Sequence, residues 1–176
     1  MPRMASMMLL IAITVSAASV VGEEMLSKYK LQVDRFGPVI VGMAPDEASK
    51  KLGTPLILGR PTDEDDSACH YVYPEGKKYG DIGFMVENGR ISRIDVHSGI
   101  VATSSAIHVG DNESVVKNAY PGNVEETVHP YLGKNGKYLT VEAKPGYAFI
   151  FETERGRIIT FRSGKLGSVK YIEGCQ

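Results

Sequence analysis

The sequence predicts an α+β protein of two tandem repeats, each with a short helix packed on an antiparallel β-meander. Two short motifs recur at almost the same spacing. Val41-Gly42 recurs as Val109-Gly110, 68 residues later, and Gly89-Arg90-Ile91 recurs as Gly156-Arg157-Ile158, 67 residues later. A period that occurs only twice indicates a duplication, because a solenoid needs at least three copies. We expect the first repeat over residues 23–103 and the second over 104–176.

A helix is predicted near the start of each repeat. In the first repeat it covers residues 45–52, with Pro45 in the first turn and Gly53-Thr54-Pro55 after its end. In the second repeat Asp111 or Asn112 can cap a helix. Its apolar positions are Val115, Val116 and Ala119, and Tyr120-Pro121-Gly122 ends it. Each helix follows a Val-Gly pair, which supports the duplication.

Strands follow each helix. Asn88-Gly89 indicates a tight hairpin because both residues accept the positive φ that such a turn requires, and Arg155-Gly156 occupies the matching place. The predicted strands cover residues 70–73, 80–87, 90–97, 138–143, 147–153 and 157–162, with a last short strand at 169–172.

Alternation along these strands assigns their side chains to two faces. The face toward the helices is predicted to hold Phe84, Val86, Ile94, Val96, Phe149, Phe151, Ile159 and Phe161. The opposite face is polar and of mixed charge, so we expect it to be open to water or to a partner. This predicted partner-binding face holds Met85, Arg93, Asp95, His97, Glu152, Thr160 and Arg162.

A secretory signal peptide is predicted at residues 1–22. Residues 7–21 form a run of 15 apolar or small residues behind Arg3. Since spanning a bilayer takes about 20 apolar residues, the run is more typical of a signal than of an anchor. Small residues allow cleavage after Ser19 or Gly22. The mature protein is then periplasmic or secreted and does not span a membrane.

The two cysteines, Cys69 and Cys175, are predicted to form a disulfide because nothing keeps thiols reduced in such a compartment. Two unpaired thiols are the alternative. The bond would close a loop of over a hundred residues and stabilise the fold by about 4 to 5 kcal/mol in the chain-entropy account.

Composition excludes several kinds of partner. The net charge of −1 offers no field that attracts nucleic acid. Two cysteines and four scattered histidines show no metal-ligand spacing, and no glycine-rich phosphate loop follows a strand. The acidic run of residues 63–66 lacks the spaced ligands and the glycine of a calcium loop, so it is interpreted as a solvated loop. We therefore expect neither a cofactor nor a metal.

A hydrolase is the enzyme class that the residues come nearest to suggesting. Asp95 and His97 lie two residues apart on one strand face, where the carboxylate could orient the imidazole. No Gly-x-Ser-x-Gly elbow supplies a nucleophile, so a solvated row of alternating charges is the simpler interpretation and we predict no enzyme activity.

The order of motifs resembles a known group of bacterial envelope domains. A signal peptide, then residues 36–43 (FGPVIVGM) opening a helix that ends in Lys51-Leu52-Gly53, then a meander, resembles the SmpA/OmlA type. Duplication of that unit with a disulfide resembles the β-lactamase inhibitory protein-like superfamily. The resemblance implies that an open, concave sheet face binds another protein. By similarity that face would bear Arg93, Asp95, His97, Thr160 and Arg162.

One departure limits what the resemblance implies. The concave surface of the inhibitor is rich in aromatic residues including tryptophan, whereas this chain has no tryptophan. β-Lactamase inhibition is therefore not transferred to it.

Together these patterns predict a secreted or periplasmic protein-binding module that uses the open sheet face, of which an inhibitor of a secreted enzyme is one form. A structural component of a cell-envelope assembly is the alternative, and a hydrolase is a third hypothesis. The partner of this protein is expected to be another protein.

Overall fold

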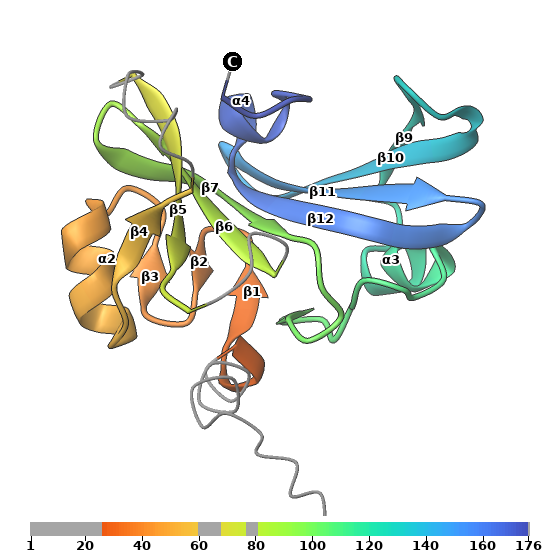
Figure 1. Cartoon of the computed structure of the whole chain (residues 1–176). Coiled ribbons are helices and arrows are strands. Elements are labelled where there is room, and N and C mark those ends of the chain that lie inside the picture. The colour runs from red at the N-terminus through yellow and green to blue at the C-terminus, as the bar shows by residue number, and fades with distance from the viewer. Residues whose placement is uncertain (1–25, 60–67, 77–80, 176) are drawn as a thin grey trace, which may run out of the picture.

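The computed structural model describes residues 26–59, 68–76 and 81–175 (Figure 1). The predicted signal peptide and the acidic run at 63–66 lie outside the described residues. Within the described part the protein is mixed α+β, mostly strands in two sheets with a few short helices.

The larger sheet has eight strands, and every neighbouring pair in it is antiparallel. Its strands, in spatial order, are β4 (Leu56–Leu58), β5 (Cys69–Pro74), β6 (Ile82–Glu87), β7 (Arg90–Val96), β12 (Arg157–Lys165), β11 (Tyr147–Glu154), β10 (Gly133–Lys144) and β9 (Glu125–His129). The pairing of β7 with β12 joins the two halves of the chain at the centre of the sheet.

The smaller sheet has four strands and was not predicted. Its strands, in spatial order, are β3 (Val39–Ile40), β2 (Arg35–Phe36), β1 (Lys30–Gln32) and β8 (Ala102–Thr103). Strands of two or three residues carry too little alternation to be recognised in a sequence.

The helices whose two ends both lie within the described residues are α2 (Pro45–Leu52), α3 (Ser114–Ala119) and α4 (Leu166–Val169). Helix α2 has the predicted bounds, begins with Pro45 and ends at Gly53, whose φ of 76° suits a left-handed cap. At α3 the side chain of Asn112 accepts a hydrogen bond from the Ser114 N–H at 2.9 Å. Both predicted helices are therefore confirmed.

The large sheet has a different covering on each face. The small sheet and helices α2 and α3 lie on one side, and α4 lies on the other (Figure 1). On the first side Phe36 of the small sheet meets Phe84 of β6 at 6.4 Å between ring centroids, and Tyr120 meets Phe149 of β11 at 6.2 Å. This side contains the main hydrophobic core.

The core face is as predicted except at Ile159. The register shifts between Glu152 and Thr153, which pair with Thr160 and Ile158, so Ile159 is an extra bulge residue. Ile158 is buried in the core and Ile159 is 38% exposed. The same irregularity occurs in the first half, where Arg93 pairs with Met85 and Ile91 with Val86, so that Ser92 is the extra residue of the bulge. Simple alternation fails here because one inserted residue moves the side chains that precede it on the strand to the opposite face.

The strand predicted at residues 169–172 is wrong. The chain forms α4 up to Val169 and then turns, without entering either sheet. Its carbonyl groups at Ser168, Val169 and Tyr171 accept hydrogen bonds from arginine side chains instead of from a neighbouring strand. Sequence propensity does not reveal such long-range side-chain donors.

Candidate functional site

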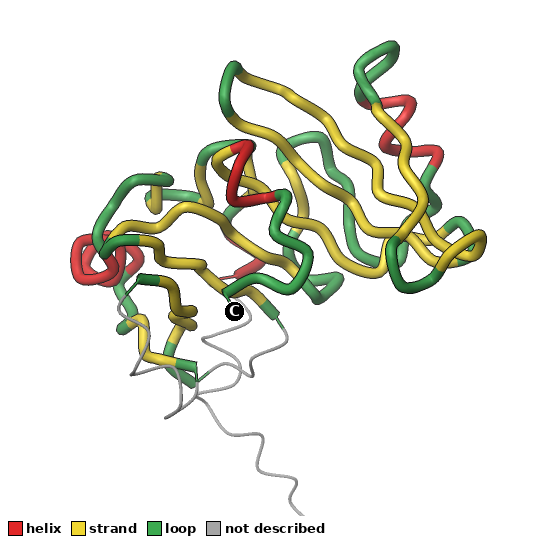
Figure 2. Tube along the Cα trace, turned by 90° about the horizontal axis from the view of Figure 1, so that it is seen from above, coloured by secondary structure: helices red, strands yellow, loops and turns green. Residues whose placement is uncertain are grey.

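The C-terminal strap, defined here as residues 166–175, lies on the face of the large sheet opposite the main core. It starts with α4 directly after β12 and ends at Cys175. Seen from above, it runs across the strands near the middle of the sheet (Figure 2). The strap therefore covers the centre of the face that the sequence predicted to be open.

Arg93 of β7 holds the strap from below. Its Nη1 donates to the carbonyl oxygens of Ser168 at 3.2 Å and Tyr171 at 2.6 Å. Its Nε and Nη2 bind the Asp95 carboxylate at 2.9 and 2.7 Å. Arg93 and Asp95 are both buried, so one guanidinium joins a buried ion pair to the backbone of the strap.

Asp95 has a second partner on β5. The Tyr71 hydroxyl donates to Asp95 Oδ2 at 3.1 Å. Burial, reinforced by the negative charge of Asp95, raises the pKa of Tyr71, so its hydroxyl stays protonated and can donate. Burial alone would lower the pKa of Arg93, but the adjacent Asp95 carboxylate raises it overall. The group is thus a charged pair with a neutral phenol.

Arg162 of β12 holds the strap at a second point. Its Nε donates to the Val169 carbonyl at 2.6 Å, and its Nη1 forms an ion pair with Glu152 of β11. The guanidinium lies 5.2 Å from the centroid of the Tyr138 ring. Glu152 in turn contacts His129 Nε2 at 3.2 Å. Two buried arginines therefore bind three backbone carbonyls of one short segment, those of Ser168, Val169 and Tyr171.

The predicted partner-binding residues are divided by this arrangement. The expectation that the face is open is wrong for Met85, Arg93, Asp95 and Arg162, which are buried. Arg93 and Arg162 are covered because the strap folds back over them, and Glu152 is half-buried.

His97 and Thr160 lie at the end of β7 and on β12. His97 is exposed and Thr160 half-buried. Thr160 Oγ1 lies 3.0 Å from His97 Nδ1 and donates to the Val96 carbonyl at 2.8 Å. Asp95 is directed to Arg93 and Tyr71, so the carboxylate and the imidazole of the hypothetical hydrolase pair have different partners.

The predicted disulfide is confirmed. Cys69 at the start of β5 bonds to Cys175 at the end of the strap, and their Cα atoms are 5.4 Å apart. The bond joins residues 106 positions apart in the chain. It fixes the far end of the strap to the first half of the sheet.

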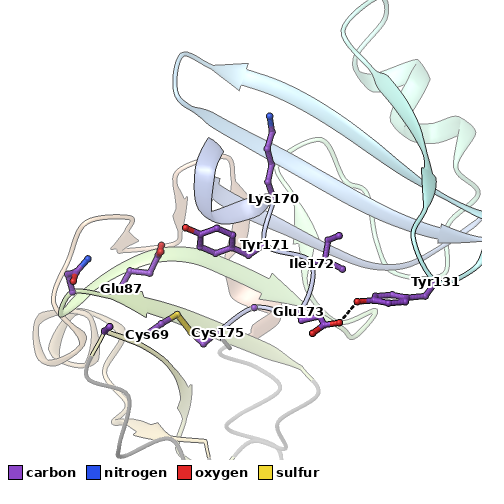
Figure 3. A pocket seen from close by; sticks show the side chains of 11 residues that line it. Cys69, Glu87, Tyr131, Lys170, Tyr171, Ile172, Glu173 and Cys175 are labelled. Atoms are coloured by element: carbon purple, nitrogen blue, oxygen red, sulfur yellow. Dashed lines mark hydrogen bonds between the residues drawn. A yellow bond between two sulfur atoms is a disulfide. The ribbon is translucent and has the colours of Figure 1, made fainter.

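A cavity of about 660 Å³ lies beside the disulfide and the strap. Three large side chains on its wall are exposed to solvent: Tyr131 by 65%, Tyr171 by 50% and Ile172 by 42%. In Figure 3 the Tyr171 ring is directed toward Glu87, Ile172 lies between the two tyrosines, and Tyr131 is hydrogen-bonded to Glu173 of the strap. This hydrogen bond raises the pKa of the exposed Tyr131 hydroxyl, which remains a donor. We call Tyr131, Tyr171 and Ile172 the strap surface.

The strap surface was not predicted from the sequence. Tyr171 and Ile172 fell in the predicted last strand, and Tyr131 lay in a segment to which no element was assigned. The available signal was a tyrosine and an isoleucine just before the second cysteine, which places two large side chains beside a covalent anchor.

Within residues 26–59, 68–76 and 81–175, no group of three or more His, Cys, Asp or Glu side chains could hold a metal ion. None of the helices in this part of the chain is long and apolar enough to cross a bilayer.

No protein-family model matches the chain, and no curated protein matches it. A solved structure, an extracellular protein containing a SCP domain from Bacillus anthracis strain Ames, is similar at a TM-score of 0.49 with 11% sequence identity. The match covers 78% of this chain and 49% of that one, so it spans about half of that protein's length. A likeness of this degree carries no conclusion about function.

Proposed function

We propose that the protein is a non-catalytic protein-binding module that acts outside the cytoplasm and binds its partner through the strap surface. The observation that carries this proposal is the exposure of Tyr131, Tyr171 and Ile172 around one cavity. Tyrosines dominate the binding energy of many protein interfaces because they bury a large area at a small entropic cost.

The backbone that carries Tyr171 and Ile172 is held in place in the unbound protein. Arg93 holds the Tyr171 carbonyl, and the disulfide at Cys175 holds the end of the segment. A braced segment loses less conformational entropy on binding, so more of its contact energy appears as affinity. The arrangement therefore suits recognition better than a free C-terminal tail would.

The disulfide and the apolar N-terminal run support a secreted or periplasmic location. Disulfides persist in oxidising compartments, and the run at residues 7–21 is typical of a signal peptide. Inhibition of a secreted enzyme is the form of binding that we propose to test first.

We also propose that the two halves are copies of one unit, related to the envelope domains that the sequence resembles. In the first half Gly42 N–H donates to the Ile91 carbonyl at 2.7 Å, and Arg90 Nη1 donates to the Gly42 carbonyl at 2.9 Å. The bulge residue is Ser92.

The second half repeats these contacts about 67 residues later. Gly110 N–H donates to the Ile158 carbonyl at 2.8 Å, and Arg157 Nη1 donates to the Gly110 carbonyl at 3.0 Å. The bulge residue is Ile159. Matching side-chain and backbone contacts support duplication more strongly than the short motifs alone.

Affinity capture tests the proposed function. The tagged oxidised protein from residue 23 onward is incubated with periplasmic and culture-fluid extracts, and the retained proteins are identified by mass spectrometry. Tyr171→Ser and Ile172→Ser change exposed side chains but leave the carbonyl that Arg93 holds. We expect each to reduce retention of the specific partner at least tenfold.

Ile57→Ser on β4 and Val128→Ser on β9 are the matched controls, since both residues are large, apolar and exposed but do not line the cavity. They should retain the partner as the unmodified protein does. Equal retention by all four variants would show that the strap surface is not the binding site.

A further inference from the structure

We propose that the Cys69–Cys175 disulfide is a redox latch: a dithiol that reduces it releases residues 170–175 and disassembles the strap surface. The inference rests on the proposed function, because it concerns regulation of that same surface. It follows from how differently the two ends of the strap are attached.

The first half of the strap is held without the disulfide. Val169 is buried and packs in a cluster with Tyr138, Ala148 and Ile150. Arg162 donates to the Val169 carbonyl, and the Leu166 N–H donates to the Gly146 carbonyl at 2.8 Å. Apolar burial and these hydrogen bonds keep residues 166–169 in place after reduction.

The second half of the strap buries little apolar surface. Four of its side chains are exposed: Lys170, Tyr171, Ile172 and Glu173. Its links to the rest of the protein include the Arg93 bond to the Tyr171 carbonyl and the Tyr131 bond to Glu173. The Lys170 and Tyr171 N–H groups also donate to the Gly167 and Ser168 carbonyls, and the buried Gly174 lies against the Tyr71 side chain. A hydrogen bond contributes about 1 kcal/mol net between neutral groups and about 1.5–3 kcal/mol when one partner is charged, because water can replace either partner. We infer that without the covalent bond these contacts do not offset the entropy of ordering six residues, at about 1–2 kcal/mol each.

The disulfide is accessible to a reductant. Both cysteines are half-buried, and both line the cavity beside the strap. One thiolate of a dithiol attacks a sulfur of the disulfide and forms a mixed disulfide, releasing the other cysteine as a thiol. The second thiol of the reagent then displaces the remaining cysteine. Cys69 and Cys175 end as two thiols, and the dithiol is oxidised to its own disulfide.

Release separates the residues of the strap surface. Tyr171 and Ile172 leave with the strap, whereas Tyr131 stays in the segment between β9 and β10. Arg93 keeps its ion pair with Asp95 and exchanges the Tyr171 carbonyl for water. The oxidised protein is thus the binding form, and reduction turns binding off.

Nuclear magnetic resonance relaxation tests the latch directly. Backbone order parameters are measured for the oxidised full-length mature chain, for the same protein in dithiothreitol, and for the double variant Cys69→Ser/Cys175→Ser. We expect values for residues 170–175 to fall from about 0.85 to below 0.6 on reduction, while those of 166–169 and β12 stay near 0.85. The order parameters of the double variant should equal those of the reduced protein and should not change when dithiothreitol is added.

Unchanged order parameters after complete reduction would overturn the latch. So would loss of ordered signals from β11 and β12, since the bond would then maintain the whole fold and not only the strap. Affinity capture under both conditions separates the two proposals. A mobile strap with undiminished capture overturns the proposed binding surface and leaves the latch standing. Reduced capture with a mobile strap supports both.

Discussion

Arg93 shows how one buried charge determines the architecture of this site. Its guanidinium forms an ion pair with Asp95 on the same strand. Its Nη1 donates hydrogen bonds to the carbonyls of Ser168 and Tyr171. A buried charge is tolerated only when such partners are present. The sequence shows the Arg-x-Asp pattern but not the backbone segment, distant in the chain, that completes it.

Arg93→Gln should therefore lower the free energy of unfolding by about 3–5 kcal/mol, because it leaves the Asp95 carboxylate buried without a cation. Urea denaturation measures the change. The double variant Arg93→Met/Asp95→Leu removes both charges and should recover much of the loss. A single variant as stable as the unmodified protein would contradict the buried ion pair.

Asp34 provides a pH-dependent contact between the two halves. Its Oδ2 accepts a hydrogen bond from Lys144 Nζ at 2.7 Å, and this bond, opposed by burial, lowers the pKa of Asp34 in the folded protein. A folded-state pKa below the unfolded value stabilises the fold above about pH 4, and the stabilisation is lost as pH falls through the folded pKa.

Asp34→Asn should cost up to about 1 kcal/mol at pH 6, because Lys144 is half exposed and the pair is screened by solvent. The difference between the two proteins should shrink toward zero as the pH is lowered from 5 to 3. Chemical denaturation at a series of pH values measures it, and a difference that grows toward low pH would contradict the assignment.

At the scale of elements, strong local signals were reliable and pairing between distant segments was not. The hairpin predicted at Asn88-Gly89 forms with φ values of 49° and 73°, and Arg155-Gly156 adopts the same turn at 49° and 79°. The conformation of a turn depends on the residues within it, so it can be predicted from the local sequence. The short strands, the bulge at Ile159 and the path of the strap depend on contacts made only in the folded chain.

The seam between β7 and β12 is such a contact. Gly164 pairs with Arg93 and has a φ of 146°. A Cβ at this position would lie 2.3 Å from the Ser92 carbonyl oxygen, so the two backbones come too close for a side chain. Glycine at this place allows the two halves of the sheet to join.

Gly164→Ala should destabilise the protein by about 3 kcal/mol, because the backbone of one strand must shift. Gly167→Ala is the control, since a Cβ there meets nothing within 4 Å and its φ is unexceptional; its effect should stay within about 0.5 kcal/mol. Thermal denaturation compares them. Equal melting temperatures for the two variants would contradict the close approach at the seam.

For the whole molecule, the sequence predicted the α+β class, both helices, the disulfide and most strands of the large sheet. Alternation grouped Arg93, Asp95 and Arg162 on one side of the sheet, since alternation is a property of single strands, but it did not predict that they are buried. It could not predict that the chain itself covers Arg93 and Arg162, because the strap meets them through backbone carbonyls that carry no sequence signal.

The disulfide should contribute to the stability of the whole fold as well as to the position of the strap. For a loop of 106 residues the chain-entropy account gives about 4.7 kcal/mol. Complete reduction should therefore lower the melting temperature by roughly 10–20 °C while the protein remains folded at 25 °C. Calorimetry with and without dithiothreitol measures this, and coincident transitions would show that the bond does not constrain the unfolded chain.

The binding surface is the central claim, and hydrogen exchange of the oxidised protein with and without its captured partner tests it most directly. We expect slower exchange in the complex for amides around Tyr131 and from Lys170 to Cys175, with exchange in β4 unchanged. Protection confined to β4 or to the helices, with the strap exchanging as in the free protein, would contradict it.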